Sequence, residues 1–167
     1  HERLVGSEMC IRDRCIVLAG VIGSKIASEL GNMRTTEQID ALEIVGINSK
    51  NYLILPKILG AITMVPLLVG ISAVIGIWGG YLVGGWAGAV PNEVYLNGIR
   101  KSLKTSYISI AFYKSLVFAF IISTVPAYFG YNVKGGALEI GKAGTRSVVV
   151  SCILILIADY IVATIAL

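Results

Sequence analysis

Long runs without charged side chains dominate the hydrophobic pattern of this chain. The longest, Ile58 to Asn92, holds 35 residues without one charged side chain. A helix needs about 20 apolar residues to cross the ~30 Å hydrocarbon core of a bilayer, so this run predicts a membrane span. We expect Pro56 and Pro66 to kink the span, and the glycines from Gly79 onward to loosen its far end into a flexible exit.

Three other segments have the same character. Ser115 to Val133 gives 19 uncharged residues, and Ser147 to Leu167 gives 21 in which Asp159 is the sole charge. Cys15 to Ser24 is apolar for only ten residues, which is too short to span alone and is typical of the inner half of a truncated helix. Because these runs lack the period of two of a barrel strand, the sequence predicts an all-α integral membrane protein with about three complete transmembrane helices and a truncated one.

A short stripe of small residues lies in and just beyond the first apolar segment. Gly20, Ser24 and Ser28 recur every four residues, which places them on one face of a helix. Such a face allows the backbone of another helix to approach closely. Small residues without a packing role are the alternative interpretation.

An acidic, amphipathic segment follows. Thr36 offers a hydroxyl cap to a short helix that Gly46 can end. The segment is too short and too charged to span, so we expect it at the membrane surface with its acidic side toward water or a protein. An acidic face that is merely solvated is the alternative. The helical period gathers Glu37, Asp40 and Glu43 on one face, and Ile39, Leu42 and Val45 on the opposite face.

A second surface helix is predicted between the long uncharged run that ends at Asn92 and the span that begins at Ser115. Asn92 to Lys104 places apolar side chains on one side, and its cationic side chains Arg100, Lys101 and Lys104 can reach lipid head groups. If the acidic helix is cytoplasmic, the loops on that side carry six cationic side chains against four outside. This agrees with the excess of Lys and Arg in cytoplasmic loops.

Composition supports the membrane assignment. Hydrophobic residues make up 56% of the chain, charged residues 14%, and the mean hydropathy is +0.80. About a quarter of the residues of a globular protein are charged, so the bilayer is the expected solvent here. The net charge of +4 is spread through short loops, which indicates membrane topology and no nucleic-acid partner.

Enzymatic and metal chemistry find no support in the residues. The three cysteines form no C-x-x-C pair and the only histidine is His1, so no zinc-type cluster or Ser-His-Asp arrangement is expected. The run GALEIGK, Gly136 to Lys142, nearly matches a phosphate-binding loop, but Ala143 stands where a hydroxyl must hold magnesium. We expect a glycine-rich cytoplasmic loop there, and neither an enzyme nor a cofactor in this chain.

The start of the chain differs from everything after it. The opening run HERLVGSEMCIRDR is charged, patternless and begins with His1. Residues 1–14 are therefore expected to be a non-native tail, and residues 15–167 the membrane domain. A native cytoplasmic N-terminus is the alternative.

One carboxylate is predicted inside the bilayer. Asp159 follows Arg146 by about 13 residues, which places it about 20 Å along its helix. Isolated charges in hydrocarbon are costly, so a partner is needed. Lys114 opens the preceding span from the outer side, and we hypothesise an intramembrane ion pair of Lys114 with Asp159. A watery cavity around Asp159 without a fixed partner is the alternative.

The stretch ASELGNMRTTEQIDALEIVGINSKNYLILPK, Ala27 to Lys57, closely resembles the signature of the MlaE-type permeases. These are membrane subunits of ABC transporters that move lipids across the bacterial envelope. Shorter family-like segments follow in the expected order, and Asp159 falls where the family carries an acidic residue. They are PLL at 66–68, GIWGGYLVG at 76–84, KSLVF at 114–118 and GKAGTRSVV at 141–149.

The resemblance implies a homodimeric permease in the bacterial inner membrane, paired with a cytoplasmic ATPase and with a lipid-binding protein of the MCE type. ATP and Mg²⁺ would belong to the ATPase. The short acidic helix would be the coupling helix that seats in a groove of the ATPase, with Glu37, Gln38, Asp40 and Glu43 as its contact residues. Full-length members carry a surface helix, a first span and the rest of the second span before the point matched by Cys15.

Two rival functions are also compatible with the sequence. A proton-coupled secondary transporter could use Asp159 as its proton-carrying carboxylate and would need no ATPase. A structural membrane anchor would only recruit partners, and the intramembrane charge argues against it.

Overall fold

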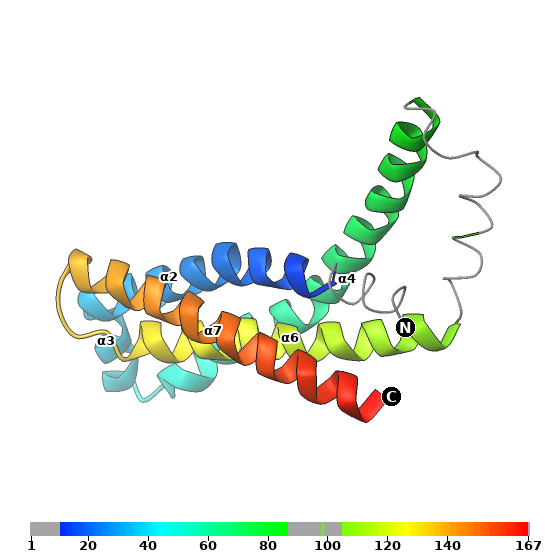
Figure 1. Cartoon of the computed structure of the whole chain (residues 1–167). Helices are drawn as coiled ribbons and strands as arrows, with labels where there is room; N and C mark the ends of the chain where they lie inside the picture. The colour runs from blue at the N-terminus through cyan, green and yellow to red at the C-terminus, as the bar shows by residue number, and fades with distance from the viewer. Residues whose placement is uncertain (1–10, 87–97, 99–104, 167) are drawn as a thin grey trace.

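The computed structural model describes residues 11–86, 98 and 105–166 of the 167-residue chain. The elements within these residues are helices, with no strand among them, which confirms the all-α prediction (Figure 1). The first helix, Ile11–Thr35, contains a π-helical segment, η1, and continues as α2. In order, the elements are η1 (Ala19–Gly23), α2 (Ser24–Thr35), α3 (Gln38–Ile44), α4 (Ser49–Trp86), α6 (Thr105–Tyr131) and α7 (Ala137–Ala166).

Four helices within the described residues are long and apolar enough to cross a membrane. The first was expected as a truncated span, yet its 25 residues suffice by length and composition. The chain is therefore a multi-pass membrane protein. The four helices are Ile11–Thr35, Ser49–Gly84, Ile108–Tyr131 and Ala137–Ile165.

Helix α6 is the centre of the bundle, because it contacts α2, α4 and α7. Figure 1 shows α2, α6 and α7 running side by side, with the chain returning from α6 to α7 near α3. A cluster of buried apolar side chains draws its members from all the spans. The largest fully buried members of this cluster are Cys15, Val65, Phe118, Ile122 and Ile155.

The small-residue face of the first helix is not the predicted one. Ser24 and Ser28 are exposed, and a Cβ on Gly20 would meet nothing within 4 Å. The buried small residues precede these by one position and share their spacing of four: they are Ala19, Gly23, Ala27 and Gly31. Close helix packing does follow a small-residue stripe, but a different one.

Gly130 in α6 marks the closest approach to that stripe. A Cβ built on Gly130 would lie 2.7 Å from the backbone oxygen of Ala27 and 2.9 Å from its Cα. Only a residue without a side chain lets the two backbones come this close. The contact fixes α2 against the last turns of α6, next to α3.

Helix α4 follows its prediction in part. Pro56 and Pro66 lie inside it, and the half of the helix beyond them points away from the other helices in Figure 1. The flexible exit expected from Gly79 is wrong as far as Trp86, because the helix continues to that residue. Glycines are tolerated in such a helix where no water competes for its backbone groups. The predicted surface helix at 92–104 lies outside the described residues, apart from residue 98.

The start of α3 also differs from its prediction. The Thr36 hydroxyl donates back to the Asn32 carbonyl at 2.8 Å, so Thr36 closes α2 and does not cap α3. A threonine at the end of a helix can donate to the carbonyl four residues earlier. Thr36 makes this bond instead of capping α3. The residue before α3 is Glu37, whose φ of 59° lies in the left-handed region.

The predicted end of α3 is confirmed. Gly46 has φ +85°, and its N–H donates to the Glu43 carbonyl at 3.0 Å. The N–H of Ile47 donates to the Leu42 carbonyl at 3.1 Å. These two bonds satisfy the last carbonyls of the helix, and glycine adopts the required φ without a Cβ penalty.

Candidate functional site

The short helix α3 connects two spans at one end of the bundle. Ile39 is fully buried and Leu42 is partly buried, so this side of α3 rests on the neighbouring helices. Val45 was expected on the same apolar face but is 74% exposed, and Ile44 is 87% exposed. The helix therefore offers both apolar and acidic side chains to its surroundings.

The four predicted coupling residues are all exposed but do not form one acidic face. Glu37 lies before the first turn of α3, so its backbone conformation separates it from the helical row. Asp40 accepts a hydrogen bond from Arg34 of α2 at 2.6 Å. Glu43 is engaged by two hydroxyl groups. Glu37 and Gln38 take part in none of the side-chain hydrogen bonds or ion pairs among the described residues.

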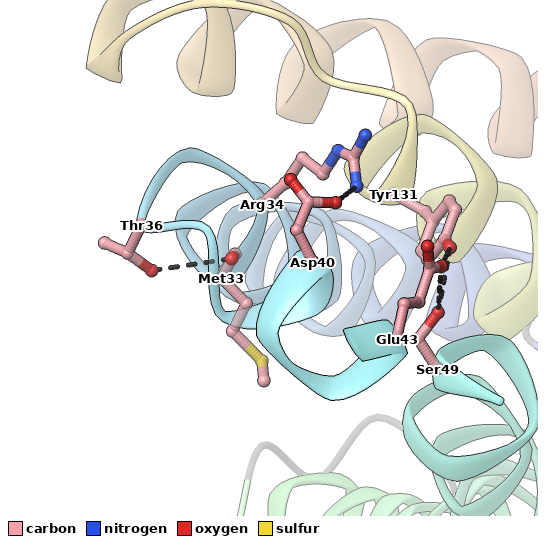
Figure 2. A network of polar contacts seen from close by, with 7 residues as sticks. All are labelled: Met33, Arg34, Thr36, Asp40, Glu43, Ser49 and Tyr131. Carbon is pink, nitrogen blue, oxygen red and sulfur yellow. Dashed lines mark hydrogen bonds and ion pairs between the residues drawn. The ribbon is translucent and has the colours of Figure 1, made fainter. Parts of the chain in front are cut away.

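Glu43 is the centre of a polar network that joins three helices (Figure 2). Its Oε1 accepts a hydrogen bond from Ser49 Oγ of α4 at 2.7 Å and from Tyr131 Oη of α6 at 3.1 Å. The two hydroxyl oxygens are 3.0 Å apart, and Ser49 is only 1% exposed. We call Glu43, Ser49 and Tyr131 the α3 anchor.

Two cations surround this anchor. The Arg34 guanidinium carbon lies 5.9 Å from the centroid of the Tyr131 ring, and Lys50 Nζ lies 5.7 Å from it. The pKa of Glu43 lies below its usual value, chiefly because Ser49 and then Tyr131 donate hydrogen bonds to the carboxylate. The positive charges of Arg34 and Lys50 act in the same direction. Glu43 is thus held ionised at neutral pH.

The second candidate site lies inside the bundle. Lys114 Nζ of α6 is 3.1 Å from Asp159 Oδ1 of α7, with 1% of the lysine side chain and 15% of the aspartate side chain exposed. The structure therefore brings together the two residues that the sequence analysis paired. An ionic contact that is this well shielded compensates two charges that would be costly apart.

Sequence reasoning missed a second inter-span ion pair and the α3 anchor. Lys57 Nζ of α4 lies 2.6 Å from Glu29 Oε2 of α2. The sequence did hold a signal for this ion pair. Glu29 follows the first apolar segment and Lys57 precedes the long uncharged run, so both lie at the ends of spans that lead to α3. The Ser49 and Tyr131 hydroxyls are 82 residues apart in sequence, and nothing in their spacing indicates that they meet.

Cofactor and metal sites find no geometric support in the described residues. Among them, no group of three His, Cys, Asp or Glu side chains could hold a metal ion. The run 136–142 was expected as a loop, but α7 already begins at Ala137. A phosphate-binding loop follows a buried strand, and the described segment before Gly136 is the helix α6, not a strand.

These observations define a class of protein: a multi-pass helical membrane protein with a short acidic helix anchored at one end of its bundle. The comparisons give the family. The permease MlaE family matches residues 8–165, and the chain belongs to it. The resemblance found in the sequence is thereby confirmed.

Relatives come from several lineages. A probable ABC transporter permease protein of Rickettsia bellii is 42% identical over 147 residues, which cover 88% of this chain and 57% of that protein. A probable ABC transporter permease protein of Synechocystis is 33% identical, with coverages of 87% and 55%. TRIGALACTOSYLDIACYLGLYCEROL 1, chloroplastic, of Arabidopsis thaliana is 32% identical, with coverages of 89% and 43%. The chain thus spans little more than half the length of these relatives, or less.

Proposed function

We propose that this chain is the permease subunit of an ATP-driven transporter that moves phospholipids or related lipids across the bacterial envelope. In this function the spans line part of a lipid path, and α3 couples them to a cytoplasmic ATPase. The family match over nearly the whole chain carries the proposal, because relatives over that length are named ABC transporter permease proteins.

The geometry of α3 supports the coupling part. A helix that transmits motion must be attached firmly to the spans while leaving side chains for a partner. The α3 anchor and the Arg34 to Asp40 ion pair provide the attachment. The exposed Glu37 and Gln38 remain for the ATPase, and an acidic side chain facing a basic groove would give orientation more than affinity.

Lipid as the substrate is supported less directly. One relative is named after trigalactosyldiacylglycerol, a glycolipid. We assign the Lys114 to Asp159 pair a structural role in the lipid path, since it joins α6 to α7 within the bundle. A homodimer, an MCE-type lipid-binding partner and an inner-membrane location complete the proposal, and all three rest on the family resemblance.

The first test is co-purification of the full-length protein with its ATPase from bacterial membranes, followed by lipid-stimulated ATP hydrolysis. Glu37→Gln and Glu37→Lys remove and then reverse a charge that is outside the α3 anchor. We expect a graded loss of ATPase binding or stimulation. Reversal of Glu43 should also uncouple hydrolysis, but Glu37 is the sharper probe because Glu43 has partners inside the chain.

Asn51→Lys is the matched control, because it makes the same charge change as Glu37→Gln at the exposed start of α4. It should bind and stimulate the ATPase as the wild type does. Equal behaviour of all three variants would refute the coupling role of α3. If no ATPase co-purifies, and transport stops when the proton gradient is collapsed or Asp159 is changed to Asn, the protein is a proton-coupled transporter instead.

A further inference from the structure

A pocket of about 250 Å³ lies between the last turns of α6 and the first turns of α7. Its lining includes three cationic side chains, Lys134, Lys142 and Arg146, and one carboxylate, Glu139. Lys142 Nζ lies 2.7 Å from Glu139 Oε1, so the carboxylate balances one of the three cations. The pocket therefore keeps an excess of positive charge, which favours an anionic ligand.

The pocket is at the same end of the molecule as α3. A Cβ on Gly31, near the end of α2, would lie 3.2 Å from the Ile140 side chain of α7, and Figure 1 shows the chain turning from α6 to α7 beside α3. This is the level where two spans end. A bilayer places its phosphate groups at the ends of the spans, so a cationic pocket here meets lipid phosphates first.

The surface beyond the pocket is suited to a lipid tail. Along α7, most of the exposed residues after Arg146 are apolar, and a row of them follows the helical spacing of three and four. Tyr128, 66% exposed, stands at the pocket wall, and amphipathic aromatic rings favour the membrane interface. Val149 at 58%, Ile153 at 52% and Leu156 at 47% are among the exposed apolar residues of α7 and share one face of the helix.

We propose that this pocket binds the phosphate of an anionic membrane lipid through Lys134 and Arg146, with the acyl chain along the exposed face of α7. The binding requires neither ATP nor an ATPase, and so it stands apart from the transport function proposed above. A free phosphate ion shares the headgroup chemistry but has no apolar part that could contact the exposed face of α7. We therefore favour the lipid.

The test titrates fluorescent phosphatidylglycerol into the full-length protein in detergent, with phosphatidylcholine as the zwitterionic reference. A basic side chain near an anionic lipid surface is worth about fivefold in affinity. We expect Lys134→Gln and Arg146→Gln each to weaken phosphatidylglycerol binding about fivefold. Arg146→Lys should retain binding, and phosphatidylcholine binding should not change.

Glu139→Gln tests the site in the opposite direction. It removes the carboxylate that occupies Lys142, so phosphatidylglycerol should bind more tightly. Lys50→Gln is the matched control, because Lys50 is an exposed cation at the same end of the bundle but outside the pocket lining. It should bind phosphatidylglycerol as the wild type does.

Several results would overturn the proposal. An equal loss with Lys50→Gln would mean general charge attraction without a site. Inorganic phosphate that binds as tightly as phosphatidylglycerol would indicate a soluble anion site. Unchanged lipid binding by Lys134→Gln and Arg146→Gln, together with lost ATPase co-purification, would make the pocket a protein contact.

Discussion

The Lys114 ammonium lies 3.1 Å from the Asp159 carboxylate, and this contact joins α6 to α7 where only 1% of the lysine side chain is exposed. Breaking a buried pair by removing one partner typically costs about 3–5 kcal/mol, because the other charge is left uncompensated. We therefore expect Lys114→Met and Asp159→Asn each to destabilise the protein by that order, measured by unfolding in mixed micelles.

The double variant separates the pair from its surroundings. Replacing both charges removes the uncompensated ion, so Lys114→Met with Asp159→Asn should be more stable than either single variant. Effects that simply add would show that the two residues act independently. If the single variants fold and transport normally, the ion pair is not needed for function.

Gly130 gives a second prediction, because its missing side chain sets the distance between α2 and α6. Gly130→Ala places a methyl group against the Ala27 backbone, which cannot move aside as a side chain could. We expect a loss of about 1–3 kcal/mol in unfolding free energy, as is usual for overpacking. Gly60→Ala in α4 is the control, because a Cβ there meets nothing within 4 Å, and it should not lower stability.

The spans were predictable from the sequence because long runs without charged residues mark them, and this signal does not depend on the exact ends of each helix. It also paired Lys114 with Asp159, since helical rise places a charge at a depth and hydrocarbon demands a partner. Neither argument needs the rotation of one helix against another.

The rotation of each helix about its own axis could not be predicted from the sequence. Ala19, Gly23, Ala27 and Gly31 repeat every four residues just as Gly20, Ser24 and Ser28 do, so spacing alone cannot choose between the two faces. The π-helical segment Ala19–Gly23 takes up more residues per turn than the ideal period and shifts the register further. The α3 anchor was out of reach for the same reason, because it needs three helices correctly rotated.

Tyr131→Phe tests whether the α3 anchor holds the helix in place. The hydroxyl group of Tyr131 contacts both Glu43 and Ser49, and its loss should lower the unfolding free energy. Hydrogen exchange of the α3 backbone should accelerate as the helix loosens. Tyr128→Phe is the matched control on the same helix, since its ring is 66% exposed, and exchange in α3 should not respond. Equal protection of α3 in both variants would mean that Tyr131 packs without anchoring.

Glu43 predicts a pH dependence of stability with a definite sign. Its folded-state pKa is below the ordinary value of 4.5, because Ser49 and Tyr131 donate to the carboxylate. The ionised group therefore stabilises the folded protein above the ordinary pKa, and this contribution is lost as the pH falls through the lowered folded-state pKa. Glu43→Gln should unfold more easily than the wild type at neutral pH, and the difference should shrink in acid below 4.5. A difference between Glu43→Gln and wild type that stays constant down to strongly acidic pH would mean that the hydroxyls do not favour the ionised form.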